Sequence, residues 1–149
     1  MLLKMICTPE VVCCSPNVTA LAAARLMRQH HVGDLVVVDD PERDQTPLGM
    51  VTDRDLVVEV LARERNPAEL TVRDIMRTPV VIASGNEDAT QALERMKTHG
   101  VRRIPVIDQD GKLLGIVSLD DMLVRLAADA SMLVDVVTRE QGREHRTRR

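Results

Sequence analysis

The feature that most constrains this chain is an internal repeat. The segment MRQHHVGDLVVVDD begins at Met27, and the similar segment MKTHGVRRIPVIDQD begins at Met96, 69 positions later. With this offset Asp39 matches Asp108. A copy of about 60 residues buries little apolar surface by itself, so the two copies are expected to pack together.

The correspondence extends beyond these segments on both sides. Downstream, the first copy has three extra residues in the loop PERDQTP, because ten residues lead from Asp39 to Gly49 and seven lead from Asp108 to Gly115. Upstream, CTPEVVCCSPNVTALAAARLM matches RTPVVIASGNEDATQALERM if Glu10 is taken as an extra residue. The repeat therefore covers most of the chain.

Each copy has the pattern of a β-α-β-β-α unit. Short apolar runs predict three strands, and helical spacing of Ala and Met predicts a helix after the first of them. The expected strands are 11–13, 35–38 and 48–51 in the first copy and 80–82, 104–107 and 113–117 in the second; the expected helices are 18–30 and 87–99, capped by Asn17 and Asn86. The fold class is α/β (α+β), with two repeats packed pseudo-symmetrically.

Charge is unevenly distributed along the chain. The net charge is −3, but residues 139–149 hold five Arg and two Glu and so carry +3, which leaves −6 on the rest. An acidic body is not typical of a protein that binds duplex nucleic acid. We expect a first domain at 1–66, a second at 67–128, and a C-terminal helix extension with a basic tail at 129–149.

The composition limits the core and the cellular setting. The chain has no Phe, Tyr or Trp, so its core must be aliphatic, and any ligand ring must lie between aliphatic side chains. An N-terminus without the apolar core of a signal peptide, together with an odd number of cysteines, favours the cytoplasm. Cys7, Cys13 and Cys14 lack the spacing of a zinc site, and no metal is expected.

A strand-to-helix turn occurs twice, as GMVTDRDL and GIVSLDDM. Thr52 with Asp55, and Ser118 with Asp121, have the spacing of a helix N-cap followed by a carboxylate in the first turn. The start of a helix, with its free N–H groups and positive dipole end, is also an anion site. The spacing alone leaves both roles open.

These segments together resemble a tandem pair of cystathionine-β-synthase (CBS) domains, known as a Bateman module. The resemblance rests on HHVGDLVVVDD and LGMVTDRDLV in the first copy and on TVRDIMRTPVVI, MKTHGVRRIPVID and GKLLGIVSLDDML in the second, and it covers about residues 4–128. Such pairs bind adenosine-containing ligands between the copies, usually sense rather than catalyse, and often form disc-like dimers. The resemblance implies a regulatory module whose ligand is AMP, with ATP, ADP, NAD or S-adenosylmethionine as alternatives.

The resemblance also implies which residues bind the ligand. In the family the Asp of the turn holds ribose and the Thr or Ser lies near phosphate. These roles are carried over to Asp55 and Asp121, and to Thr52 and Ser118. The segment that enters the first strand lies near adenine, and its candidates are Thr8, Thr78 and Pro79, which otherwise form a Thr-Pro bend.

Positive charge for a phosphate is expected in one copy only. Arg102 and Arg103 precede the strand IPVID, where the family places phosphate-contacting groups, although adjacent Arg residues are also common on solvated surfaces. The matching residues of the first copy are Gly33 and Asp34, and Asp34 would repel a phosphate if it faced the cleft. We expect two unequal sites, one of which favours phosphorylated ligands.

The leading hypothesis is a nucleotide-sensing module whose two copies shift on binding and are read by a separate effector protein. No nucleophile, base and orienting group assemble in the sequence, so no enzyme is expected. The alternative is a scaffold whose basic tail docks nucleic acid or an acidic protein. A homodimer is expected because the closing helices carry surplus apolar residues, namely Met122, Leu123, Leu126, Met132, Leu133 and Val136.

Overall fold

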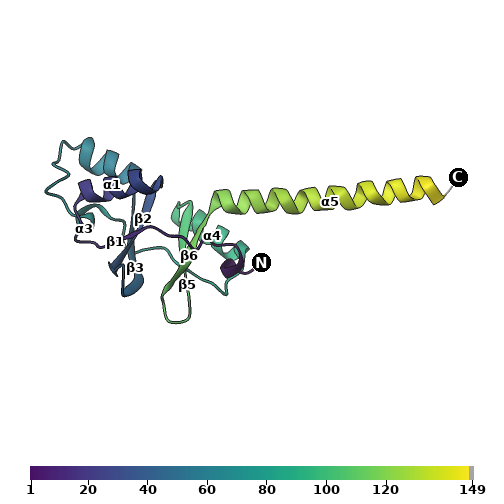
Figure 1. Ribbon diagram of the computed structural model, residues 1–149, viewed down its shortest axis with the longest axis horizontal. Helices are drawn as coiled ribbons and strands as arrows, with labels where there is room; N and C mark the ends of the chain where they lie inside the picture. Colours follow the sequence, from purple (N-terminus) through teal and green to yellow (C-terminus); the bar gives the residue numbers. More distant parts are fainter. Residues whose placement is uncertain (148–149) are drawn as a thin grey trace.

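The computed structural model describes residues 1–147, which form two three-stranded sheets, one for each repeat (Figure 1). In each sheet a two-residue strand pairs in parallel with a central strand, and the third strand is antiparallel to the centre. The strands are β1 (Cys13–Cys14), β2 (Asp34–Asp40) and β3 (Asp44–Thr52), then β4 (Ala83–Ser84), β5 (Arg103–Ile107) and β6 (Leu113–Ser118). The predicted α+β class and pairing of repeats are confirmed.

Each repeat packs an eleven-residue helix and a closing helix against its sheet. Small or flexible residues at helical spacing form the buried face, with Ala23 and Met27 in the first repeat and Ala92 and Met96 in the second. The helices are η1 (Leu3–Met5), α1 (Ala20–His30), α2 (Asp53–Asp55), the π-helix η2 (Leu56–Leu61), α3 (Val72–Ile75), α4 (Ala89–His99) and α5 (Leu119–Thr147).

The helices α1 and α4 begin two residues later than predicted. Thr19 and Asp88 are their N-caps, and the prediction of Asn17 and Asn86 was wrong. The reason is tertiary, because Thr19 forms a β-bridge with Thr71 and an equivalent bridge involves Asp88. These bridges hold Thr19 and Asp88 themselves extended, while Asn17 and Asn86 lie in the turns that precede them. The short first strands likewise lie at β1 and β4, two to three residues beyond the predicted starts.

Each hydrophobic core is completed by a segment from outside its own repeat. Leu3 is fully buried in the second core, and its N–H donates to the carbonyl of Glu87 at 2.9 Å. Val72 and Ile75 are buried in the first core, where the N–H of Val72 donates to the carbonyl of Val18 at 2.9 Å. The two repeats are therefore interlocked by equivalent segments that lie 69 positions apart.

The same offset holds at the entry to each sheet. Thr8 pairs with Ile116 of β6 through two backbone hydrogen bonds, and Arg77 pairs in the same way with Met50 of β3. Arg77 is thus the equivalent of Thr8. The alignment that treated Glu10 as an extra residue was wrong here, because backbone pairing, rather than the shared Thr-Pro letters, sets the register.

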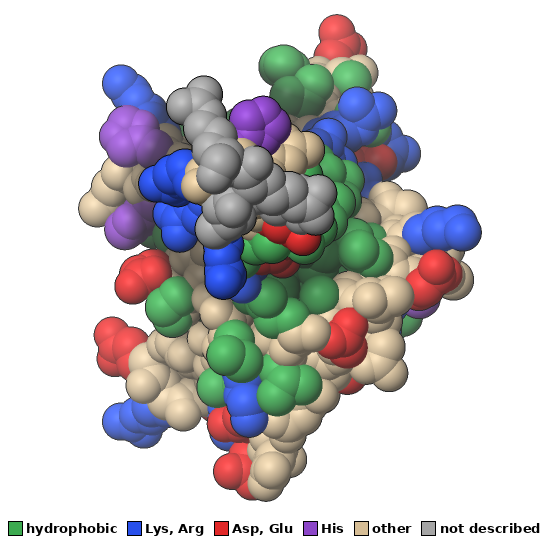
Figure 2. All heavy atoms as spheres, turned by 90° about the vertical axis from the view of Figure 1, so that its right-hand side faces the viewer, with side chains coloured by type: hydrophobic (Ala, Val, Ile, Leu, Met, Phe, Trp, Pro, Cys, Tyr) green, Lys and Arg blue, Asp and Glu red, His purple; other side chains and the backbone are tan. Residues whose placement is uncertain are grey.

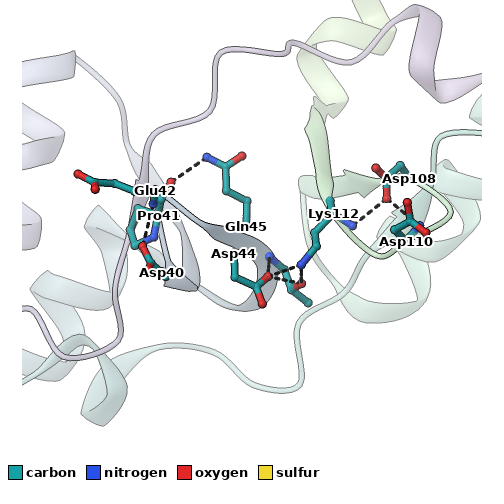
Figure 3. A network of polar contacts seen from close by, with 9 residues as sticks. Asp40, Pro41, Glu42, Asp44, Gln45, Asp108, Asp110 and Lys112 are labelled. Atoms are coloured by element: carbon teal, nitrogen blue, oxygen red, sulfur yellow. Dashed lines mark hydrogen bonds and ion pairs between the residues drawn. The ribbon is translucent and has the colours of Figure 1, made fainter.

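Two ion pairs join the sheet regions of the two repeats. Lys112 Nζ on the second repeat donates to Asp44 Oδ1 at 2.6 Å and to Thr46 at 3.2 Å, and Figure 3 shows this side chain reaching across from β6 to β3. Arg103 Nη1 donates to Asp34 Oδ2 at 2.5 Å. Positions 34 and 103 are equivalent, so this second pair lies where the two repeats meet about their pseudo-twofold axis.

The helix α5 leaves the body and projects away from it (Figure 1). It includes the basic tail as far as Thr147, while positions 148 and 149 of that tail lie outside the described residues. Within residues 1–147 no helix combines the length and the apolar character needed to cross a membrane.

Candidate functional site

The two strand-to-helix turns both form the predicted helix caps. The N–H of Asp55 donates to Thr52 Oγ1 at 3.1 Å, and the N–H of Thr52 donates back to Asp55 Oδ2 at 2.9 Å. Ser118 and Asp121 make the same reciprocal pair, with both bonds at 3.0 Å. Capping is therefore part of the role of both turns.

Asp55 has a second partner that places it at the interface between the repeats. Its Oδ2 serves the cap, while its Oδ1 accepts a hydrogen bond from Arg77 Nε at 3.1 Å. Asp55 is only 5% exposed, and it is the one buried charged residue in the described part of the chain. A buried carboxylate needs such a partner, so Arg77 and the turn are structurally coupled.

Glycine is required where the entry segments cross β3 and β6. A Cβ on Gly49 would lie 2.9 Å from the carbonyl oxygen of Arg77, and one on Gly115 would lie 2.6 Å from the carbonyl oxygen of Thr8. Backbone atoms cannot move aside as a flexible side chain can. The glycine that opens each turn motif thus lets the entry segment lie directly on the strand.

A cavity of about 470 Å³ opens between β3 and the second repeat. Its walls are mainly aliphatic, and three arginines and one histidine supply its polar groups. The lining residues are Met50, Arg77, Pro79, Val80, Val81, Ile82, Arg95, His99, Val101 and Arg103. An apolar cavity with a few convergent polar groups is the usual form of a small-molecule site.

Each lining arginine is held by a carboxylate. The pairs are Arg77–Asp55 at 3.1 Å, Arg95–Glu87 at 2.8 Å and Arg103–Asp34 at 2.5 Å. Arg95 also donates to the carbonyl of Ile82. A guanidinium has five N–H donors, so each pair orients its arginine and leaves other donors for a ligand anion.

The structure divides the predicted site residues into two groups. Pro79 and Arg103 line the cavity, and Thr52 and Asp55 adjoin it through Arg77. Thr78 precedes Pro79 in an exposed position. The sequence left open which turn carboxylate accompanies Arg103, and the geometry indicates Asp55.

The second group lies around the other turn. Arg102 points to the start of α5, where its Nη2 donates to the exposed Asp120 at 3.1 Å, and it does not line the 470 Å³ cavity. Thr8 reaches this side through its backbone pairing with Ile116, near Ser118 and Asp121. Arg102 lies in the bend before β5 and Arg103 is the first residue of that strand, so the two side chains point to different sides.

Sequence reasoning missed Arg77 and Arg95. Both carried a usable signal, since at the offset of 69 Arg77 matches Thr8 and Arg95 matches Leu26. A charge that is present in one copy and missing in the other is the signal that could have singled out both residues. The signal was overlooked for Arg77 because the Thr-Pro letters placed it one position out of register.

A smaller cavity, of about 380 Å³, occupies the matching place on the first repeat. It is lined by Glu10, Val11, Val12, Cys13, His30, Pro41 and Gln45. The first five match Pro79, Val80, Val81, Ile82 and His99 of the larger cavity. Burial raises the pKa of the Cys13 thiol, and it raises the pKa of the neighbouring Cys14 to about 11, so these thiols are protonated at neutral pH.

Comparison with protein families agrees with this duplicated architecture. The model of the CBS domain matches residues 3–62 and again residues 72–128. The chain belongs to the CBS domain family. Both matches cover the strands and turns that form the two cavities, so this CBS pair carries one cavity for each domain.

Two relatives show how far the sequence similarity extends. An uncharacterized protein of Methanopyrus kandleri is 40% identical over 114 residues, which are 76% of this chain and 57% of that protein. The CBS domain-containing protein YhcV of Bacillus subtilis is 36% identical over 124 residues, which are 83% of this chain and 84% of YhcV. The chain thus spans little more than half of the first relative.

Two solved structures have the same fold. Hypoxic Response Protein I, solved with two coordinated zinc ions, is 32% identical with a TM-score of 0.73 and matches 83% of this chain and 97% of its own. The CBS domain pair of protein MJ0100, solved with 5-methylthioadenosine and S-adenosyl-L-methionine, is 22% identical with a TM-score of 0.74 and matches 87% of this chain and 98% of its own. Residues 1–147 contain no cluster of three or more His, Cys, Asp or Glu that could hold a metal.

Proposed function

We propose that this CBS pair is a nucleotide-sensing regulatory module that binds an adenosine phosphate, with AMP as the first candidate, in the cavity lined by Arg103. The observation that carries the proposal is the combination of aliphatic walls with three arginines in one cavity. Aliphatic walls suit a purine ring, and guanidinium groups suit a phosphate. The family to which the chain belongs supports the same ligand class.

The buried turn supplies a place for the ribose. Asp55 Oδ1 is already occupied by Arg77 Nε, so a ribose hydroxyl that donated to this oxygen would share it with the guanidinium. The other N–H groups of Arg77 would remain for the phosphate. Thr52 stabilises the helix start on which Asp55 sits. Thr78 is then a neighbour of the cavity through Pro79.

The charge of the cavity ranks the ligands. ADP, ATP and NAD carry phosphates as AMP does, whereas the sulfonium of S-adenosylmethionine would be repelled by the arginines. The smaller cavity has Glu10 and no arginine among its lining residues, so it suits an uncharged or cationic ligand. S-adenosyl-L-methionine, which is present in the structure of the MJ0100 pair with the same fold, is an example of a cationic ligand.

Ligand binding would be signalled through Arg103. This residue both lines the cavity and forms an ion pair with Asp34 across the two repeats. A phosphate that engages Arg103 weakens its hold on Asp34 and so changes the free energy of the contact between repeats. A ligand shifts a conformational equilibrium by its differential affinity for the two states, and an effector protein would read the shift.

The proposed module binds its ligand without catalysing a reaction. The basic tail takes no part in this binding. In the alternative, the arginines of residues 139–149 dock an acidic protein or nucleic acid. Deleting residues 139–149 separates the two, because AMP binding should survive the deletion and tail-dependent docking should not. Loss of AMP binding on this deletion would contradict the location of the ligand site.

Isothermal calorimetry tests the proposal with AMP, adenosine and S-adenosylmethionine on the full chain. At the cavity lined by Arg103 we expect AMP to bind more tightly than adenosine, and adenosine more tightly than S-adenosylmethionine. Arg103→Ala should weaken the binding of AMP alone. Saturation at 100 times Kd should stabilise the fold by about 2.7 kcal/mol, visible as a higher Tm. Equal affinity for AMP and adenosine would refute the assignment of Arg103 to phosphate.

A further inference from the structure

The helix α5 presents an exposed apolar surface far from both cavities. Eight large hydrophobic side chains on it are 52–72% exposed, namely Leu123, Val124, Leu126, Met132, Leu133, Val134, Val136 and Val137. The helix has 29 residues and is about 43 Å long, and its outer half touches nothing else in Figure 1. Helices in water derive most of their stability from packing an apolar face, so this half requires a partner.

Six apolar residues of α5 form a heptad seam. Intervals of four and three residues alternate along Leu119, Leu123, Leu126, Ala130, Leu133 and Val137. This is the spacing at which one face of a helix meets another helix along its length. The opposite face carries polar residues such as Arg139, and the seam ends where Glu140 follows Val137.

The inner part of the seam borders an apolar groove on the body. A cavity of about 190 Å³ lies between α4 and the start of α5, and its lining includes Leu93, Leu119, Leu123 and Leu126. Figure 2, which views the molecule from the side toward which α5 projects, shows hydrophobic side chains on the body beside the helix. A second helix laid along the seam would cover this groove as well.

We propose that α5 pairs in antiparallel orientation with α5 of a second copy of this chain, the outer half of each helix lying in the groove at the base of the other. The inference is independent of the nucleotide site. Met132 and Val136, like Val124, lie off the seam. Leu93 and the five exposed α5 side chains on or beside the seam (Leu123, Leu126, Leu133, Val134 and Val137) each offer roughly 100 Å² of apolar surface. Two copies would then bury about 1,200 Å² in total, which is the lower end of the range for stable interfaces.

The orientation follows from which half of the helix is free. The inner half lies against its own α4, so a parallel partner would bring a second body into the space that the first body occupies. The outer half carries no body and can enter the groove. An antiparallel pair also brings the tail, which carries +3 over residues 139–149, toward a body that carries −6.

The seam sets the register of the pair. Ala130 would lie opposite Leu133 of the second copy, and Leu126 would lie opposite Val137 of the second copy. A small residue then faces a large one in the central layers, which an in-register parallel pair with Ala130 facing Ala130 would not achieve.

Light scattering on the full chain tests the interface. We expect the wild type to have twice the monomer mass of 16.6 kDa, and Leu133→Asp or Val137→Asp to shift it to 16.6 kDa with an unchanged Tm of the body. Val124→Asp is the matched control, because Val124 is 72% exposed on α5 but points away from the seam. A monomeric wild type, seam variants that remain dimeric, or a monomeric Val124→Asp would each overturn the proposal.

Disulfide trapping tests the orientation. Leu126→Cys and Val137→Cys proteins are mixed and oxidised, and linked peptides are identified by mass spectrometry, which separates them from those of the native cysteines. The antiparallel pair should give the mixed 126–137 link. Links of 126 to 126 or of 137 to 137 indicate a parallel pair, and absence of any link between these positions places the contact elsewhere; both results contradict the proposal.

Discussion

The two cavities of this CBS pair have the same backbone arrangement but differ in charge at equivalent positions. Where the second repeat has arginine, the first has a neutral or acidic residue, and the matched positions are Arg77 with Thr8, Arg95 with Leu26, and Arg103 with Asp34. Glu10 takes the place of Pro79. The comparison shows that the two repeats keep the same framework while the charges at these positions diverge, so the two proposed sites are expected to differ in ligand charge.

Substitution of Arg103, which lines the cavity and also pairs with Asp34 across the repeats, should have the largest effect on AMP affinity. We expect Arg103→Ala to lower AMP affinity about ten- to hundredfold, because charge-assisted hydrogen bonds are worth roughly 1.5–3 kcal/mol, and to leave adenosine affinity nearly unchanged. Calorimetry with both ligands measures this. Arg102→Ala is the matched control, since Arg102 pairs with exposed Asp120 outside the cavity; an equal loss in both variants would erase the distinction between them.

The two turn carboxylates provide the next test. Asp55→Ala should lower AMP affinity and destabilise the fold by about 1–3 kcal/mol, because it removes a cap and leaves Arg77 without its buried partner. Asp121→Ala should cost about 0.5–1 kcal/mol and leave AMP binding intact. Urea titration and calorimetry separate the two effects. If Asp55→Ala and Asp121→Ala lost similar stability and neither changed AMP affinity, both carboxylates would act only as helix caps.

Releasing Arg103 from its carboxylate should have a smaller and opposite effect. In Asp34→Asn the charge of Arg103 is no longer offset, and AMP affinity should rise about two- to fivefold, since a partly exposed ion pair is worth ~0.2–1 kcal/mol. Asp120→Asn removes the partner of Arg102 and serves as the control. Weaker AMP binding in Asp34→Asn would mean that Asp34 orients Arg103 more than it competes with the phosphate.

The smallest expected effect concerns pH and the pair in Figure 3. A hydrogen bond from Lys112 holds the pKa of Asp44 at about 2, below its ordinary value of 3.8. A lowered pKa stabilises the fold above pH 3.8, and this contribution disappears as the pH falls toward 2. Asp44→Asn should therefore flatten the dependence of Tm on pH in that window, while Glu42→Gln on the same turn should not. If Asp44→Asn and the wild type had the same dependence of Tm on pH, the Asp44–Lys112 pair would not contribute to the contact between repeats.

The sequence predicted the site better in its local features than in its long-range ones. Thr52 with Asp55 forms the expected cap because a capping box involves four consecutive residues and depends little on the rest of the fold. The caps expected at Asn17 and Asn86 were wrong because bridges from distant segments hold Thr19 and Asp88 extended, and the helices begin only after these residues. Arg77 was missed because the shared Thr-Pro letters aligned it with Cys7, and the backbone pairing established its equivalence to Thr8.

What the sequence by itself determined is the duplicated α+β unit, the aliphatic core, the two capped turns and the unequal charge of positions 34 and 103. These follow from periodicity and residue chemistry, which act over a few residues and are repeated in the chain. Only the tertiary structure decided that Asp55 rather than Asp121 adjoins, through Arg77, the cavity that Arg103 lines, and that Leu3 completes the core of the distant repeat. Such choices depend on which segments meet across the pseudo-twofold axis, and no local pattern records that meeting.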